Sequence, residues 1–98
     1  MEEIIFDKIR HTDENGNEYW MARELATAMD YKDYWNFKGL IEEAQKLFSQ
    51  NNAKLEDHFV ETNEMVEVGS GANRSVPSYW LTRYACLLIA MYANAKKS

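Results

Sequence analysis

The stretch "NGNEYWMARELATAMDYKDYWNF", residues 15–37, joins a turn signal to two helical patterns and predicts the order of elements in the first half of the chain. Asn15-Gly16 is typical of the tight turn of a β-hairpin, because both residues tolerate a positive φ. Residues rich in β-formers lie on both sides of this pair, so we expect a hairpin over residues 4–21. A two-residue type I′ turn would set His11 opposite Trp20 in that hairpin.

Two helices are predicted after the hairpin. Apolar residues at i, i+3, i+4 and i+7 predict a short helix over residues 22–29, and a second apolar stripe predicts a longer helix over residues 33–50. Two helices joined by a short polar turn resemble a helix-turn-helix, which leaves a groove-reading role open beside simple packing. For Arg23 in the first helix we expect a salt bridge to a nearby acid, with a contact to a ligand phosphate as the alternative.

The second half of the chain predicts another hairpin and a final helix. Two strand-like segments separated by "GSGA" indicate a hairpin over residues 60–81. Pro77 cannot donate a backbone hydrogen bond, so its strand should lie at an edge or be bulged there. Thr82 is a suitable N-cap for a helix over residues 82–95.

The final helix is apolar on every side, because residues 84–93 carry no charge. It is far shorter than the roughly 20 residues that span a bilayer, so we expect no membrane insertion. A second copy of the chain would cover its outer face, which predicts a homodimer; the alternative is a central helix wrapped by the chain's other elements. The expected interface residues are Leu87, Leu88, Met91 and Tyr92.

These elements predict an α+β fold in a single domain over residues 1–98. Two β-hairpins pack with three helices, and the last helix is either central or at a dimer interface. Ninety-eight residues suffice for one small core and not for two.

The composition excludes several classes of function. Cys86 is the single cysteine, and with only His11 and His58 the chain has no set of zinc ligands, so we expect no disulfide, metal or cofactor. The carboxylates and imidazole of Glu56 to His58 are adjacent in sequence and fit a capped turn better than a catalytic site. A thiol within an apolar helix is not activated. We therefore expect no enzyme activity, and the acidic N-terminus, which lacks a secretory signal, favours the cytoplasm.

Charge is divided unevenly along the chain. The net charge is −5, but residues 1–67 hold all sixteen acids and seven bases, whereas residues 68–98 hold four bases and no acid. This division favours contact between the last third and an anionic partner such as DNA, although an uneven division by chance is equally compatible with it.

The glycine-rich tip of the second hairpin is the candidate nucleic-acid site. Glycine permits close backbone approach, and hydroxyl, amide and guanidinium groups suit phosphate oxygens. An ordinary flexible hairpin loop is the alternative. The candidate residues, including the basic positions that follow, are Gly69, Ser70, Gly71, Asn73, Arg74, Ser75, Arg83, Lys96 and Lys97.

Three segments, "IRHTDENGNEYWMARELATAMDY", "WNFKGLIEEAQ" and "EDHFVETNEMVEVGSGANRSVPSYWLTRYACLLIAM", are similar in order and spacing to the DNA-damage-inducible protein D family. That family belongs to the wider BRO-N group of viral BRO proteins and phage antirepressors. The family features present in this chain are Asn15-Gly16, Trp20, Arg23, Gly69-Ser70-Gly71, and Arg83 with Tyr84. The glycine turn that commonly ends the apolar helix in the family is absent, which leaves the helix free to run on.

The resemblance implies a small α+β module associated with DNA binding and with the DNA-damage (SOS-type) response, without catalytic residues. Two hypotheses follow from it. The first is a DNA-associated regulatory module that binds through the glycine-rich hairpin and the basic last third. The second is a dimerising protein-interaction module that acts on a DNA-repair or repressor protein without contacting DNA.

Overall fold

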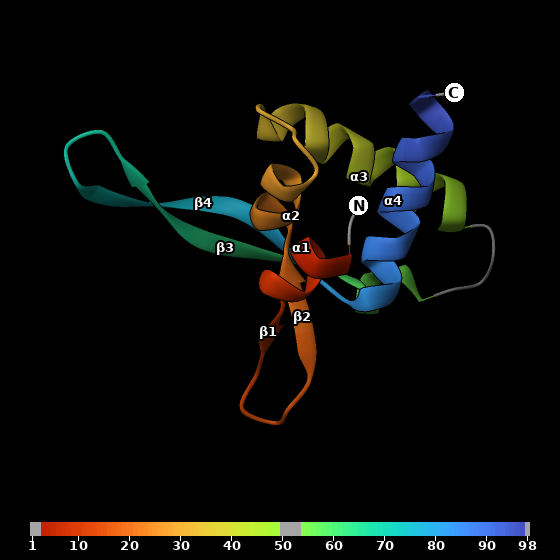
Figure 1. Cartoon of the computed structure of the whole chain (residues 1–98), viewed down its shortest axis with the longest axis horizontal. Helices are drawn as coiled ribbons and strands as arrows, with labels where there is room; N and C mark the ends of the chain where they lie inside the picture. Colours follow the sequence, from red (N-terminus) through yellow and green to blue (C-terminus); the bar gives the residue numbers. More distant parts are fainter. Residues whose placement is uncertain (1–2, 50–53, 98) are drawn as a thin grey trace.

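The computed structural model describes the backbone of residues 3–49 and 54–97 and the side chains of residues 6–49 and 54–94. Within these residues, four α-helices and a four-stranded antiparallel sheet of order β1-β2-β4-β3 form the α+β fold that the sequence predicts (Figure 1). The elements in chain order are α1 (Glu3–Lys8), β1 (His11–Thr12), β2 (Glu18–Met21), α2 (Ala22–Ala28), α3 (Tyr34–Phe48), the 3-10 turn η2 (Leu55–Asp57), β3 (Phe59–Val68), β4 (Ala72–Leu81) and α4 (Arg83–Lys97).

The N-terminal segment differs from the strand expected from residue 4. Residues 3–8 form the helix α1, which makes four helices instead of three, and the first hairpin begins only at His11. The reason is a tertiary contact that outweighs β-propensity. The Phe6 ring stacks on Trp20 with 4.2 Å between centroids, and Trp20 Nε1 donates to the Phe6 carbonyl at 3.0 Å. That carbonyl lies near the end of α1, where it has no acceptor role within the helix.

The turn of the first hairpin also differs from the expected type I′ form. Gly16 has a positive φ of 83° and Asn15 does not, and the register sets His11 opposite Tyr19 instead of Trp20. The Asp13 carboxylate accepts the backbone N–H groups of Asn15 and Asn17, each at 2.9 Å. These bonds favour a type I turn closed by a left-handed glycine, which lengthens the loop by one residue.

Local signals set the limits of the two middle helices close to the predicted ones. Asp30 ends α2 in the left-handed region with φ of 68°, and the Tyr31 N–H bonds to the Ala26 carbonyl at 2.9 Å in a Schellman arrangement. The Asp33 carboxylate then accepts the Trp35 N–H at 2.9 Å and begins α3.

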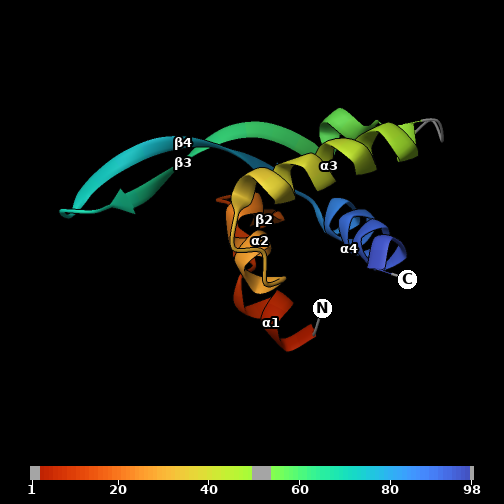
Figure 2. The same ribbon diagram turned by 90° about the horizontal axis from the view of Figure 1, so that it is seen from above.

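The second hairpin projects from the rest of the molecule. β3 and β4 pair without a break from Phe59 opposite Leu81 to Val68 opposite Ala72, whereas β2 pairs with β4 only through Trp20 and Met21. Beyond that point no third strand of the described chain adjoins the ribbon, and none of residues 63–76 is buried. We call residues 63–76 the arm. Figures 1 and 2 both show its tip at the end of the molecule opposite α3 and α4.

Pro77 fits this arrangement without a bulge. The register is the same on both sides of it, where it lies opposite Asn63. β2 has already ended, so the side of β4 turned away from β3 is an edge at this position. The missing N–H therefore costs no strand pairing, as predicted for an edge.

α4 packs against α3, β2 and β4 and completes the core. Its buried residues are Ala85, Cys86, Leu88, Ile89 and Ala93. Thr82 is confirmed as its N-cap, since Thr82 Oγ1 accepts the Ala85 N–H at 3.2 Å. The helix continues beyond Asn94 to Lys97. Of the helices that the structure describes, none has both the length and the apolar character to cross a membrane.

Candidate nucleic-acid interface

Two glycines shape the turn at the tip of the arm: Gly69 and Gly71 have positive φ values of 41° and 86°. The Gly71 N–H bonds to the Gly69 carbonyl at 2.9 Å, which closes the chain around Ser70. A side-chain carbon added at either glycine would meet nothing within 4 Å, so backbone conformation, and not crowding, explains the glycines. All three tip residues are exposed.

The three predicted residues that follow lie on β4 and alternate in direction. Asn73 and Ser75 point to one face of the ribbon and Arg74 points to the other, because successive side chains of a strand alternate. Arg74 lies opposite Val66 in the register. It is seven residues from Leu81, which corresponds to about 23 Å along the strand.

Arg83 is exposed, but it is tied to the body of the fold and does not join the tip. Its Nε and Nη2 donate to the two carboxylate oxygens of Glu18 at 2.8 and 3.0 Å, and its guanidinium lies 5.3 Å from the Phe6 ring centre and 5.2 Å from the Trp20 ring centre. The hydrogen bond from Arg83 lowers the pKa of Glu18, and the same bond raises the pKa of Arg83. Arg83 therefore fastens the start of α4 to β2.

The predicted site residues fall into two separate groups. The tip group lies at the far end of the arm, whereas Arg83, Lys96 and Lys97 lie on α4 at the other end of the molecule, whose longest dimension is 44 Å (Figures 1 and 2). The side chains of Lys96 and Lys97 are outside the part that the structure describes. One copy of the chain does not bring Arg74 and Arg83 into a single basic patch.

The predicted interface residues divide in a similar way. Leu87 and Met91 are exposed, at 53% and 59%, whereas Leu88 is buried in the chain's own core and Tyr92 packs partly against it. The burial of Leu88 is explained within a single copy. In the part of α4 whose side chains the structure describes, the exposed large apolar residues are Tyr84, Leu87 and Met91.

Among the described side chains Arg23 has no acidic partner, so the expected salt bridge is not seen. Its Nε donates to the Pro77 carbonyl at 2.8 Å, and its guanidinium lies 4.0 Å above the centre of the Tyr34 ring. The residue thus ties α2 and α3 to β4 where the arm begins. Its partner is a backbone carbonyl 54 residues away, which no local pattern could indicate.

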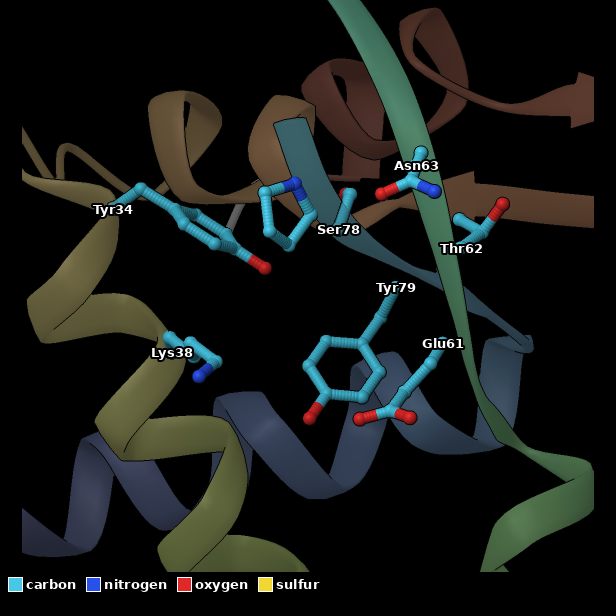
Figure 3. Close-up of a pocket in the computed structure, with 8 residues that line it drawn as sticks. Tyr34, Lys38, Glu61, Thr62, Asn63, Ser78 and Tyr79 are labelled. Carbon is cyan, nitrogen blue, oxygen red and sulfur yellow. The ribbon is translucent and has the colours of Figure 1, made fainter. Parts of the chain in front are cut away.

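A hollow that no sequence pattern indicates lies beside this contact, between α3 and the strands at the base of the arm. Figure 3 shows Tyr34 and Lys38 on one side of it and Glu61 and Tyr79 on the other. Its volume is about 300 Å³. The two tyrosines stand 45 residues apart in sequence and gave no signal as a pair.

The other residues that could have taken part in catalysis, Glu56 to His58 and Cys86, have structural positions. Glu56 and Asp57 form part of η2, and His58 Nδ1 lies 2.7 Å from Thr82 Oγ1. Cys86 is fully buried, and burial raises its pKa to about 12, so its thiol stays protonated. In the described ranges, no three histidine, cysteine or carboxylate side chains are grouped so as to hold a metal ion.

Comparison with known proteins gives one family and one relative. Residues 8–98 match the family described as "BRO family, N-terminal domain". The chain is 33% identical over 92 residues to DNA damage-inducible protein D of Escherichia coli strain K12. The aligned region covers 94% of this chain and 34% of that protein. The chain thus spans about a third of the length of this relative. No solved structure matches.

Proposed function

Because the chain belongs to the BRO family N-terminal domain, we propose that it is a non-enzymatic regulatory module of the DNA-damage (SOS-type) response that binds DNA through the tip of its arm. The link to DNA damage rests on the name of the Escherichia coli relative, of which this chain spans 34%. The link to DNA rests on the DNA association that the family resemblance implies.

The observation that carries the proposal is the projection of the arm. A two-stranded ribbon that no third strand adjoins is marginal in stability by itself, so an exposed one of this length suggests that contact with a partner maintains it. The major groove of B-DNA is wide enough to admit a two-stranded β-ribbon. The arm has the shape required to enter it.

The charge distribution favours contact between DNA and the tip over contact between DNA and the body. Residues 68–82 contain Arg74 and no acid, and the tip offers backbone N–H groups with the side chains of Ser70 and Asn73. The acids of the arm are Glu64 and Glu67, on β3. Glu64 lines a hollow with Arg23 beside α2, so it lies toward the body and away from the tip. Glu67 lies opposite Asn73, close to the tip, on the face of the ribbon away from Arg74, so phosphates would approach the tip on the Arg74 face.

Fluorescence anisotropy with single- and double-stranded oligonucleotides at two salt concentrations tests this function. We expect affinity to fall with salt, and Arg74→Ala to weaken binding by about two- to fivefold while reducing the salt slope by about one for each tip engaged. Arg10→Ala is the matched control. It removes the same charge from an exposed site on the body, where Arg10 lies 3.9 Å from Asp7.

Two outcomes contradict DNA binding by the tip. One is binding that does not respond to salt, or no binding at all. The other is an equal loss of affinity in Arg74→Ala and Arg10→Ala, which would trace the effect to net charge alone.

A second candidate function is dimerisation through α4, with action on a DNA-repair or repressor protein. The observation that favours it is the exposed apolar stripe of Tyr84, Leu87 and Met91, at 42%, 53% and 59% exposure. These positions are spaced i, i+3 and i+7, so they share one face of the helix. A second copy related by a two-fold axis would cover that face with its own.

Light scattering with Leu87→Glu tests the dimer. The matched control is Leu47→Glu, because Leu47 is also about half exposed, at 52%, but lies on α3. We expect a dimer mass for the wild type and for the control, and a folded monomer for Leu87→Glu. A monomeric wild type, or equal masses for both variants, would contradict the α4 interface.

A further inference from the structure

A groove runs between α3 and the start of β3, at the base of the arm. It is made of two neighbouring hollows of about 300 and about 500 Å³ that share Glu61 and Tyr79. The first is the hollow of Figure 3, with Tyr34 and Lys38 on its α3 side. The second continues past Glu42 and Glu56. We call the two together the acidic groove.

The charges of the acidic groove are only partly balanced. Lys38 is the basic residue that lines it, and Lys38 Nζ already lies 3.6 Å from Glu42 and 5.4 Å from the centre of the Trp35 ring. Glu56 and Glu61 form no ion pair with any residue that the structure describes. The groove therefore presents two unpaired carboxylates and would repel phosphate groups.

Tyr79 is the floor that both hollows share. It is 6% exposed, and its pKa is raised first by burial and then by the charges of Glu61 and Glu42. These carboxylates thus act on the same ring from β3 and α3. A flat cation that lies on an aromatic face between carboxylates gains both ring and ion-pair contacts.

Two further features leave hydrogen-bonding groups unused at the groove. Ser78 lines the first hollow with 3% exposure, and its hydroxyl oxygen has no hydrogen-bond partner within the described part. It lies near enough to the Tyr34 hydroxyl to affect the Tyr34 pKa, but the pair lacks hydrogen-bond geometry. In addition, β3 is the last strand in the sheet order, so no strand of the described chain pairs with its outer edge beside Glu61.

From these features we infer that the acidic groove binds an extended segment of a partner protein that carries arginine. The guanidinium lies on Tyr79 and donates to Glu56 and Glu61, while the segment's backbone pairs with the outer edge of β3. A metal ion does not suit the groove, because its carboxylates are not grouped closely enough to hold one. Arginine suits it better than lysine, since its planar fork can reach two carboxylates and still stack on a ring. This inference does not depend on DNA binding at the tip.

The test is a fluorescence anisotropy titration of the whole chain with a labelled glycine–serine peptide that carries three arginines. A peptide with citrulline at the same positions keeps the shape and removes the charge. The groove variant is Glu56→Gln with Glu61→Gln, and the matched control is Glu14→Gln with Glu67→Gln, which changes the net charge equally at exposed sites outside the groove. Circular dichroism verifies that both variants keep the native fold.

We expect the arginine peptide to bind and the citrulline peptide not to bind. The groove variant should lose about fivefold or more in affinity, and the control variant less than about twofold, because each exposed ion pair contributes modestly and the two add. Arg74→Ala should leave peptide binding unchanged, which separates this site from the tip.

Three results would overturn the inference. Equal losses in the groove and control variants would reduce it to general attraction by net charge. Equal binding of the citrulline peptide would remove the role of the guanidinium. A labelled single-stranded oligonucleotide that binds the wild type and loses affinity in the groove variant alone would assign this surface to nucleic acid instead.

Discussion

The guanidinium of Arg83 and the carboxylate of Glu18 form two parallel hydrogen bonds, of 2.8 and 3.0 Å, across 65 residues of sequence. Such a fork joins the first turn of α4 to β2 and fixes the angle at which the last helix meets the sheet. Arg83→Ala should destabilise the fold, and Glu18→Gln should add little further loss in the double variant. Thermal unfolding of the four proteins in a double-mutant cycle measures this coupling.

The pair also has a defined pH dependence. The hydrogen bond from Arg83 holds the folded pKa of Glu18 below its ordinary value of 4.5, so its contribution to stability is present above about pH 4.5 and is lost as the pH falls through the folded value. Unfolding of the wild type and of Arg83→Ala should therefore converge on acidification. A constant difference between the two proteins from pH 7 to pH 3 would show that ring contacts, and not the ion pair, account for the effect of Arg83.

The Phe6 and Trp20 stack should make α1 a structural part of the core. Phe6→Ala removes a ring that is 5% exposed, and the expected loss is about 3 kcal/mol in the free energy of unfolding. Urea unfolding measures it, with Leu47→Ala as an exposed control expected to change stability by less than about 0.5 kcal/mol. A loss as small as that of the control would mean that α1 frays from the body in solution.

Asp30 occupies a backbone conformation that glycine adopts without cost. Asp30→Gly should raise the free energy of unfolding by about 0.5–1 kcal/mol, because its φ of 68° lies in the left-handed region. Lys32→Gly is the control in the same loop. Its φ is not positive, and it should lower stability by several tenths of a kcal/mol. A loss of stability in Asp30→Gly would show that the aspartate side chain contributes more than its backbone costs.

Cys86 should be inert in the folded protein. Its thiol is buried, with the pKa raised to about 12, so a thiol-specific disulfide reagent at pH 8 should label the chain only after urea unfolds it. The stability due to this neutral thiol is complete below pH 9 and is lost as the pH rises from 9 toward about 12. Cys86→Ala should have a flatter decline over that range. Rapid labelling of the native protein would contradict this placement of the thiol.

Local patterns predicted the parts of the fold whose signals lie within a few residues. The helical stripe of residues 22–29, the hairpin at 60–81 and the Thr82 cap are of this kind, and the structure has them within one or two residues. Residues 3–8 form a helix because Phe6 packs against Trp20, and Trp20 is too far away in sequence for a local pattern to include it. The sequence therefore predicted a strand where the structure has a helix.

The candidate site shows the same division. The exposed glycine tip followed from sequence alone, because turn residues between two strands identify it. The partners of Arg23 and Arg83 lie 54 and 65 residues away, so their structural roles could not be separated from ligand contacts. The acidic groove forms only because the fold brings residues of α3 and β3 to the same hollow, and no residue spacing in the sequence predicts that arrangement.

The arm lies outside the buried core. No residue from 63 to 76 is buried, so substitutions there leave the core of Trp20, Phe37 and Leu81 untouched. Related chains are then free to exchange the residues of the ribbon at little thermodynamic penalty. Evolution could therefore change the surface of the arm while the buried core of the domain stays the same.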